Sequence, residues 1–268
     1  MAGQEQIIRK ASLIGNGAHI FVPKEWAGEE IVLTRKPKKP MREMVLDVLE
    51  PYLEDISGAF LFGSYARGEA RTDSDVDLFV VSNKKIKIKK RGFGVVCVQE
   101  GKFENALDIA PVIIYSMLSE AKPIINAGFL ERLREKYKPK LNDFRDFLED
   151  CHRAIKINES LLEEEDKEYT ENTASAYSLI LRLRGAFIIR CLLAHKEYSK
   201  TLFKDWINSN LPDVDFDSIY NSYVNVKIGR NGRRKLKIKD LLALLELLRK
   251  EVNKLRDGKK KKATGERH

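Results

Sequence analysis

The sequence predicts an α+β protein in which a small mixed sheet flanked by helices is followed by an all-α helical bundle and preceded by a small β-module. Two short apolar runs, Phe60–Phe62 and Leu78–Val81, enclose a polar turn and predict two strands of the sheet. Apolar residues recur at helical spacing from Leu141 onward. These patterns predict four parts: a β-module at 1–36, a mixed α/β domain at 41–138, a helical bundle at 141–257 and a disordered basic tail at 258–268.

The first 36 residues carry the signals of a hairpin followed by a short helix. Gly15-Asn16-Gly17 is a turn sequence that joins paired strands, and a short helix after Pro23 and a strand over Ile31–Thr34 complete the module. In these features the module resembles AbrB-type swapped-hairpin DNA-binding proteins. The resemblance implies a homodimer, because one copy is too small to bury a core, and contact with nucleic acid, to which the basic tail would add. The alternative is a β-extension packed on the main domain without a DNA role.

The stretch between the two apolar runs contains a glycine–serine turn followed by two carboxylates. Gly63 and Ser64 offer backbone N–H groups and a hydroxyl at the start of a short helix, which suits a phosphate. Asp75 and Asp77 start the second strand two residues apart, so both lie on one face, about 6–7 Å apart at their Cα atoms. Two carboxylates that close repel each other unless a cation lies between them, and Mg²⁺ favours one or two carboxylates with substrate phosphates. The alternative is an exposed acidic turn.

The spacing of Gly63-Ser64, ten residues and then Asp75-x-Asp77 resembles the signature of the polymerase-β-type nucleotidyltransferases, and the fuller pattern is similar to their minimal branch. The resemblance covers residues 41–120. It implies transfer of a nucleoside monophosphate from an NTP, with ATP as the expected donor and Mg²⁺ or Mn²⁺ as the cofactor. It also implies that the two carboxylates hold the metal and that the phosphates are bound by Gly63, Ser64, Arg67 and Ser74.

A third carboxylate is expected from the apolar run Ala106–Tyr115, which predicts a further strand with Asp108 inside it. In the family a third acid lies on a strand beside the pair, and the resemblance makes Asp108 the best match. Asp77 and Asp108 would hold a second metal ion near the acceptor, and Asp108 would accept the acceptor's proton. Two alternatives stay open: Glu104 as the third acid, and Asp108 as an edge residue facing solvent.

The basic stretch Lys84–Arg91 alternates lysine with isoleucine and has two interpretations. One is an edge strand protected by its lysines, and the other is a basic rim near the triphosphate or an RNA backbone. A further strand is predicted over Gly94–Val98 and a charged helix over Lys122–Tyr137. Before the glycine–serine turn a helix is predicted over residues 41–57, with Pro51 as the point where it kinks or restarts.

The C-terminal half is predicted to be helical over residues 141–165, 171–196, 199–208 and 238–256. The stretch 172–195 is the most apolar and is expected at the centre of the bundle. This half resembles HEPN-type bundles, and Arg190 and His195 match the Arg-x4-His motif of their ribonuclease members. The two side chains would share a face only if the helix ends near His195. The alternative is an arginine in an ion pair and a histidine at a helix end.

The net charge and the cysteines limit the class of protein. The net charge of +9 favours polyanionic partners. Cys97, Cys151 and Cys191 show no zinc spacing and are expected as buried thiols. The sequence shows no signal peptide and no apolar run long enough for a membrane span, so a cytoplasmic protein without a membrane partner is expected.

The acceptor hydroxyl is not identified by the sequence, and it belongs to a small molecule, an RNA 3′ end or a protein side chain. Two other functions stay open. One is a toxin–antitoxin-like regulator that modifies a partner protein or cleaves RNA through its helical domain. The other is a nucleic-acid-binding protein with a non-catalytic nucleotide site.

Overall fold

The structure, a computed structural model, describes residues 7–34, 40–70, 74–164, 168–171, 173–229 and 235–265. Side chains are described as far as Asp257. Contacts between residues divide the chain into two units, Met1–Met44 and Val45–His268. The predicted boundary between residues 41–138 and 141–257 falls inside the second unit and stays a prediction.

The first unit contains the predicted hairpin. Strands β1 (Ser12–Ile14) and β2 (Gly17–His19) pair antiparallel across Gly15-Asn16, and Gly15 has a φ of +53° that suits a tight hairpin turn. A 3₁₀ turn, η1 (Lys24–Trp26), follows at the position of the predicted short helix.

The rest of the first unit differs from the expectation. Residues Ile31–Thr34 form no strand, and no described side chain before Val45 is buried. The large apolar side chains of Leu13, Phe21 and Val32 are exposed. The described part of this unit therefore has no core of its own, and its AbrB-like character stays a prediction.

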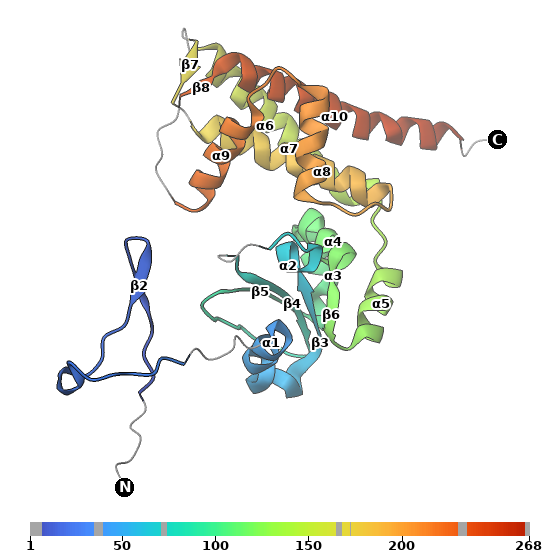
Figure 1. Ribbon diagram of the computed structural model, residues 1–268. Coiled ribbons are helices and arrows are strands. Elements are labelled where there is room, and N and C mark those ends of the chain that lie inside the picture. The colour runs from blue at the N-terminus through green and yellow to red at the C-terminus, as the bar shows by residue number, and fades with distance from the viewer. Residues whose placement is uncertain are drawn as a thin grey trace. The chain divides into compact units, whose positions relative to one another are not determined.

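The second unit begins with a part built around a four-stranded mixed sheet of order β5-β4-β3-β6, and the helical half follows it along the chain (Figure 1). Strand β3 runs antiparallel to both β4 and β6, whereas β4 and β5 are parallel. Nearly every residue of β4 is buried, which explains its continuous apolar sequence after Asp77. The strands are β3 (Ile56–Phe62), β4 (Val76–Ser82), β5 (Phe93–Gln99) and β6 (Lys122–Ile125).

The helix that precedes the sheet restarts at Pro51, as the sequence predicts. Helix α1 (Met41–Leu49) changes into the 3₁₀ segment η2 (Glu50–Asp55), with the proline in the first turn of η2. A proline is tolerated there because the first turn has no partner for its missing N–H. The core face of α1 is formed by Val45, Val48 and Leu49.

The predicted strand Ala106–Tyr115 is wrong, because this run forms parts of two helices. After η3 (Glu100–Lys102), α3 (Phe103–Ile109) ends and α4 (Pro111–Glu120) begins with its proline in the first turn. The predicted helix Lys122–Tyr137 also begins too early, because its first residues form β6 and only Ala127–Lys136 form α5.

The C-terminal half is helical, as predicted, and α7 is its most buried helix (Figure 1). Helix α7 packs against α4, α6, α9 and α10. Helix α8 ends at Asn210, two residues beyond the predicted end at residue 208 and before Pro212. The elements are η4 (Leu141–Phe144), α6 (Arg145–Glu163), β7 (Tyr169–Thr170), α7 (Thr173–Leu193), α8 (Lys200–Asn210), α9 (Phe216–Lys227), β8 (Leu236–Lys237) and α10 (Ile238–Gly265).

Two features of this half correct the sequence interpretation. Helix α9 lies in a stretch for which no element was expected. Helix α10 continues to Gly265, so the tail predicted as disordered from residue 258 is helical over its first residues. None of the described helices is long and apolar enough to span a membrane.

Candidate active site

The glycine–serine turn joins β3 to a short helix, α2 (Gly63–Arg67), as predicted. Gly63 has a φ of +71°, in the left-handed region, and a Cβ placed on it would lie 2.3 Å from Oδ2 of Asp77. On the other side, a Cβ on Gly94 of β5 would lie 2.6 Å from Oδ1 of Asp77. The Asp77 carboxylate therefore occupies a space that two glycines leave open.

Asp75 and Asp77, the carboxylate pair, lie in an environment that disfavours negative charge on Asp77. Burial raises the pKa of Asp77, and the negative charges of Asp75 and Glu120 raise it further. Lys227 and Arg67 act in the opposite direction. Asp75 is exposed and precedes the first residue of β4. The pair therefore combines one half-buried and one exposed carboxylate with a net excess of negative charge.

Glu120, at the end of α4, was not expected at the site. Its Oε1 accepts a hydrogen bond of 3.0 Å from the backbone N–H of Gly63, and its Oε2 forms an ion pair with Arg67. Arg67 also forms an ion pair of 2.8 Å with Glu69. Burial lowers the pKa of Arg67, but the hydrogen bonds and charges of Glu69 and Glu120 outweigh it, and the net pKa is raised. Arg67 is thus held between two carboxylates.

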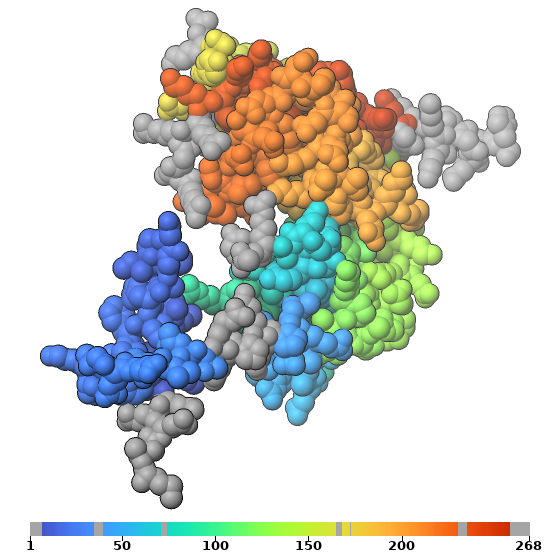
Figure 2. All heavy atoms as spheres, in the orientation of Figure 1, coloured from blue at the N-terminus to red at the C-terminus, as the bar shows by residue number. Residues whose placement is uncertain are grey.

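The helical half contacts this turn directly, and Figure 2 shows the α2 segment (cyan) against the orange surface of that half. The backbone N–H of Lys200 donates to Oε1 of Glu69 at 2.9 Å. The ring of Tyr198 lies within reach of two guanidinium groups, those of Arg67 at 5.5 Å and Arg184 at 5.4 Å. No local sequence pattern predicts these contacts, because they join residues far apart along the chain.

The remaining predicted phosphate ligands lie close to the carboxylates along the chain. Ser64 is the second residue of α2 and is half-buried, and Ser74 is half-buried immediately before Asp75. The structure therefore keeps Gly63, Ser64 and Arg67 on one turn.

Asp108 does not join the carboxylate pair. It is exposed on α3 rather than placed in a strand, and its charge acts on Tyr115, whose pKa is raised first by burial. Strand β5, the parallel neighbour of β4, places Gly94 beside Asp77 and carries no acid. Within the described residues, no three His, Cys, Asp or Glu side chains gather as a metal site. The predicted placement of Asp108 beside the pair is wrong, and the alternative Glu104 is likewise exposed on α3.

Arg190 and His195 take the positions expected of an ion-paired arginine and a histidine at a helix end. Helix α7 ends at Leu193, and His195 has a φ of +52°. Arg190 forms an ion pair of 3.3 Å with Glu251 and stacks over the rings of Phe187 and Trp206. Its guanidinium is therefore already engaged, and HEPN-like chemistry stays a prediction.

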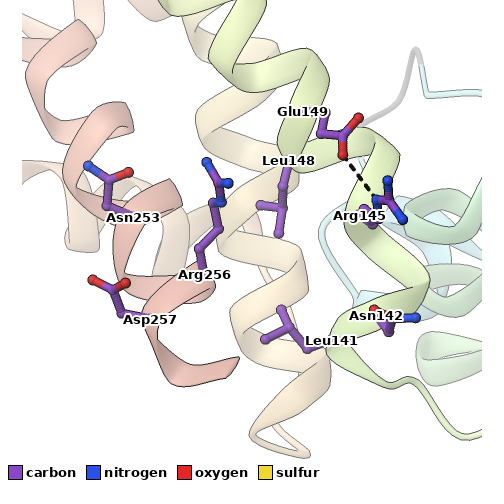
Figure 3. A pocket seen from close by; sticks show the side chains of 8 residues that line it. All are labelled: Leu141, Asn142, Arg145, Leu148, Glu149, Asn253, Arg256 and Asp257. Atoms are coloured by element: carbon purple, nitrogen blue, oxygen red, sulfur yellow. Dashed lines mark hydrogen bonds and ion pairs between the residues drawn. The ribbon is translucent and has the colours of Figure 1, made fainter. Parts of the chain in front are cut away.

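A pocket of about 520 Å³ lies elsewhere, between η4 and the start of α6 on one side and residues 253–257 of α10 on the other (Figure 3). Arg145 and Glu149 form an ion pair of 3.0 Å at its edge. None of the predicted site residues lines it. The lining residues are Leu141, Asn142, Arg145, Leu148, Glu149, Asn253, Arg256 and Asp257.

The fold and the site define a nucleotidyltransferase-type domain. Residues 43–127 match the family described as "Polymerase beta, Nucleotidyltransferase". The match covers about a third of the chain and includes the glycine–serine turn and the carboxylate pair. The resemblance of this part to polymerase-β-type nucleotidyltransferases is confirmed. No protein among the curated sequences compared matches the chain.

Two solved structures are similar to the chain at low identity. A nucleotidyltransferase-like protein from Exiguobacterium sibiricum 255-15 is 14% identical with a TM-score of 0.37, and the alignment covers 80% of this chain and 75% of that one. Spectinomycin adenyltransferase AAD(9) from Enterococcus faecialis, in a structure with ATP and spectinomycin, is 13% identical with a TM-score of 0.40. That alignment covers 79% of this chain and 97% of the adenyltransferase.

Proposed function

We propose that the protein transfers a nucleoside monophosphate from an NTP, with ATP as the expected donor, to an acceptor hydroxyl. The observation that carries this proposal is the position of Asp77, which two glycines accommodate between the glycine–serine turn and β5. The neighbouring Asp75 supplies a second carboxylate at the same place. The family match over residues 43–127 supports a transferase of this type.

The donor set at this position fits a divalent cation. The charges of Asp75 and Glu120 disfavour an ionised Asp77, so a bound cation would relieve the repulsion. Carboxylate oxygens are the protein ligands that Mg²⁺ and Mn²⁺ favour, and Asp75 and Asp77 are the residues that would hold the ion. When bound, the ion would neutralise charge on the triphosphate and on the leaving pyrophosphate.

The chain's own residues would position the triphosphate and complete its binding. Gly63, Ser64, Arg67 and Ser74 are the proposed phosphate ligands, and Lys227 is a cation whose charge reaches Asp77 from α9. In the reaction the acceptor oxygen forms a bond to the α-phosphorus. The bond from that phosphorus to the bridging oxygen breaks, its electron pair leaves with pyrophosphate, and the acceptor proton passes to solvent.

Labelling of cell extract tests the proposal. The protein is incubated with α-labelled NTPs, Mg²⁺ and extract, and label is measured in RNA, protein and metabolite fractions. We expect label from ATP in one fraction, and none with a variant that carries both Asp75→Asn and Asp77→Asn. Equal labelling by this double variant, or no labelling by the native protein in any fraction, would overturn the proposal.

Glu120→Gln is expected to strengthen binding of the magnesium–nucleotide complex by about three- to tenfold. The Glu120 carboxylate accepts a hydrogen bond from the Gly63 N–H and pairs with Arg67, which are two of the proposed phosphate ligands. It therefore competes with the phosphates for both groups, and its negative charge repels them. Calorimetry of nucleotide binding measures the effect. Glu131→Gln is the matched control, since it removes one charge from an exposed ion pair with Arg134. Weaker binding by Glu120→Gln would show that Glu120 holds Arg67 in place instead.

A further inference from the structure

The connection between β4 and β5 exposes a run of cations. Parallel strands cannot be joined by a tight turn, so the chain must cross back along the sheet between residues 83 and 92. Along this crossing Ile88 is buried, whereas Lys85, Lys87 and Lys89 are exposed. The backbone of Ile88 is hydrogen-bonded to the thiol of Cys97 on β5, which fixes the crossing against the sheet.

The exposed lysines are spaced regularly. Alternation of exposed and buried side chains is typical of an extended chain, in which residues two apart lie on the same side at about 6–7 Å. The connection forms no strand, so the interpretation of its lysines as guards of an edge strand is wrong. Within the described residues Lys84 pairs with Asp55, but no ion pair joins the five cations that we call the basic strip: Lys85, Lys87, Lys89, Lys90 and Arg91.

The basic strip ends at the carboxylate pair. The carbonyl of Gly92, the residue after the strip, accepts a hydrogen bond of 2.9 Å from the N–H of Val76. The parallel ladder continues from there, with Gly94 paired to Asp77. An extended polymer bound along the basic strip would therefore have one of its ends next to Asp75 and Asp77.

We propose that the basic strip binds the phosphodiester backbone of a single-stranded nucleic acid whose 3′-hydroxyl is the acceptor. This inference rests on the proposed nucleotidyl transfer. The strip offers regularly spaced point charges, as a strand with one phosphate per nucleotide requires. It offers no exposed apolar or aromatic side chain, which the centre of a protein interface would need.

The reaction then extends the strand by one nucleotide. The 3′ oxygen bonds to the α-phosphorus of the NTP, the bond to the bridging oxygen breaks, and pyrophosphate leaves with the electron pair. The hydroxyl proton passes to solvent. The products are a strand longer by one nucleotide and pyrophosphate, and no further reactant is needed.

A matched pair of triple variants tests the strip. One carries Lys85→Gln, Lys87→Gln and Lys89→Gln, and the control removes equal charge from α10 by changing the exposed lysines Lys239, Lys250 and Lys254 to Gln. Fluorescence anisotropy measures binding of labelled single-stranded RNA and DNA of one sequence across a salt series. Each neutralised phosphate of a single strand contributes about −0.7 to the slope of log K against log salt. The strip variant should therefore lose about 2 from the slope and bind at least about tenfold more weakly at low salt, whereas the control should keep the native slope.

Two further readouts separate this inference from the proposed function. Magnesium–nucleotide binding by the strip variant should equal that of the native protein, and addition to the RNA or DNA 3′ end should fall with strand binding. Whether the RNA or the DNA is extended shows whether the acceptor strand carries ribose or deoxyribose. An unchanged slope, an equal loss in the control, or label from extract on a protein or a metabolite would overturn the strip's role while leaving the transferase proposal standing. If the native protein bound the strand but transferred label neither to the strand nor to any fraction of the extract, both the transferase proposal and the acceptor role would be contradicted.

Discussion

Asp77→Asn lowers the rate of nucleotidyl transfer by at least about a thousandfold, which corresponds to about 4 kcal/mol of lost transition-state stabilisation. The carboxylate is the proposed metal ligand closest to the glycine–serine turn, and an amide neither carries the charge nor holds a divalent cation comparably. Single-turnover transfer from α-labelled ATP, with the acceptor fraction found by labelling of extract, measures the loss.

The same substitution should leave the fold intact and at least as stable. The folded pKa of Asp77 lies above its ordinary value of 3.8, mainly through burial, so the ionised carboxylate destabilises the folded state. The protein therefore loses stability as the pH rises from that ordinary value through the raised folded pKa of Asp77. An uncharged amide of the same shape removes this loss. Urea unfolding at neutral pH should show an unchanged or higher free energy of unfolding, and a clear decrease would contradict the description of this site.

Asp108→Asn is the matched control. Its carboxylate is exposed on α3, and transfer should stay within about twofold of the native rate, because surface substitutions of this kind change little. A loss as large as that of Asp77→Asn would restore Asp108 as the third acid expected from the sequence.

The part of the site that could be predicted from the sequence is local. Gly63, Ser64, Asp75 and Asp77 lie within one strand–turn–strand stretch, where turn chemistry and strand alternation indicate the geometry directly. The stretch Ala106–Tyr115 was predicted wrongly because a short apolar run cannot be assigned to strand or helix by periodicity alone. Its proline, which opens α4, was the overlooked signal for a helix start.

The rest of the site depends on contacts that no local pattern specifies. Glu120 reaches Gly63 from 57 residues further along the chain. Lys227 acts on Asp77 from α9, a helix that the sequence pattern does not predict. The position of each depends on how α4 and α9 pack, and helix packing is set by the whole core rather than by the residues that reach the site.

Gly63→Ala should both destabilise the protein and lower transfer by at least about a hundredfold. The left-handed backbone, with a φ of +71°, costs a residue with a Cβ about 1–2 kcal/mol. The new methyl group would also lie 2.3 Å from Oδ2 of Asp77, so the carboxylate must move, and small displacements of catalytic groups cost about a hundredfold in rate. Urea unfolding and single-turnover transfer measure the two effects.

Two other glycines separate the backbone effect from the steric one. Gly68 has a φ of +73° with nothing within 4 Å of its Cβ position, so Gly68→Ala should lose about 1–2 kcal/mol of stability and keep its activity. Gly94 has no positive φ, but its Cβ would lie 2.6 Å from Oδ1 of Asp77, so Gly94→Ala should lose activity with less loss of stability. If Gly94→Ala transferred at the native rate, activity would not require the Asp77 carboxylate to lie in its position between the two glycines. That position would then no longer support the proposal that Asp77 is a metal ligand.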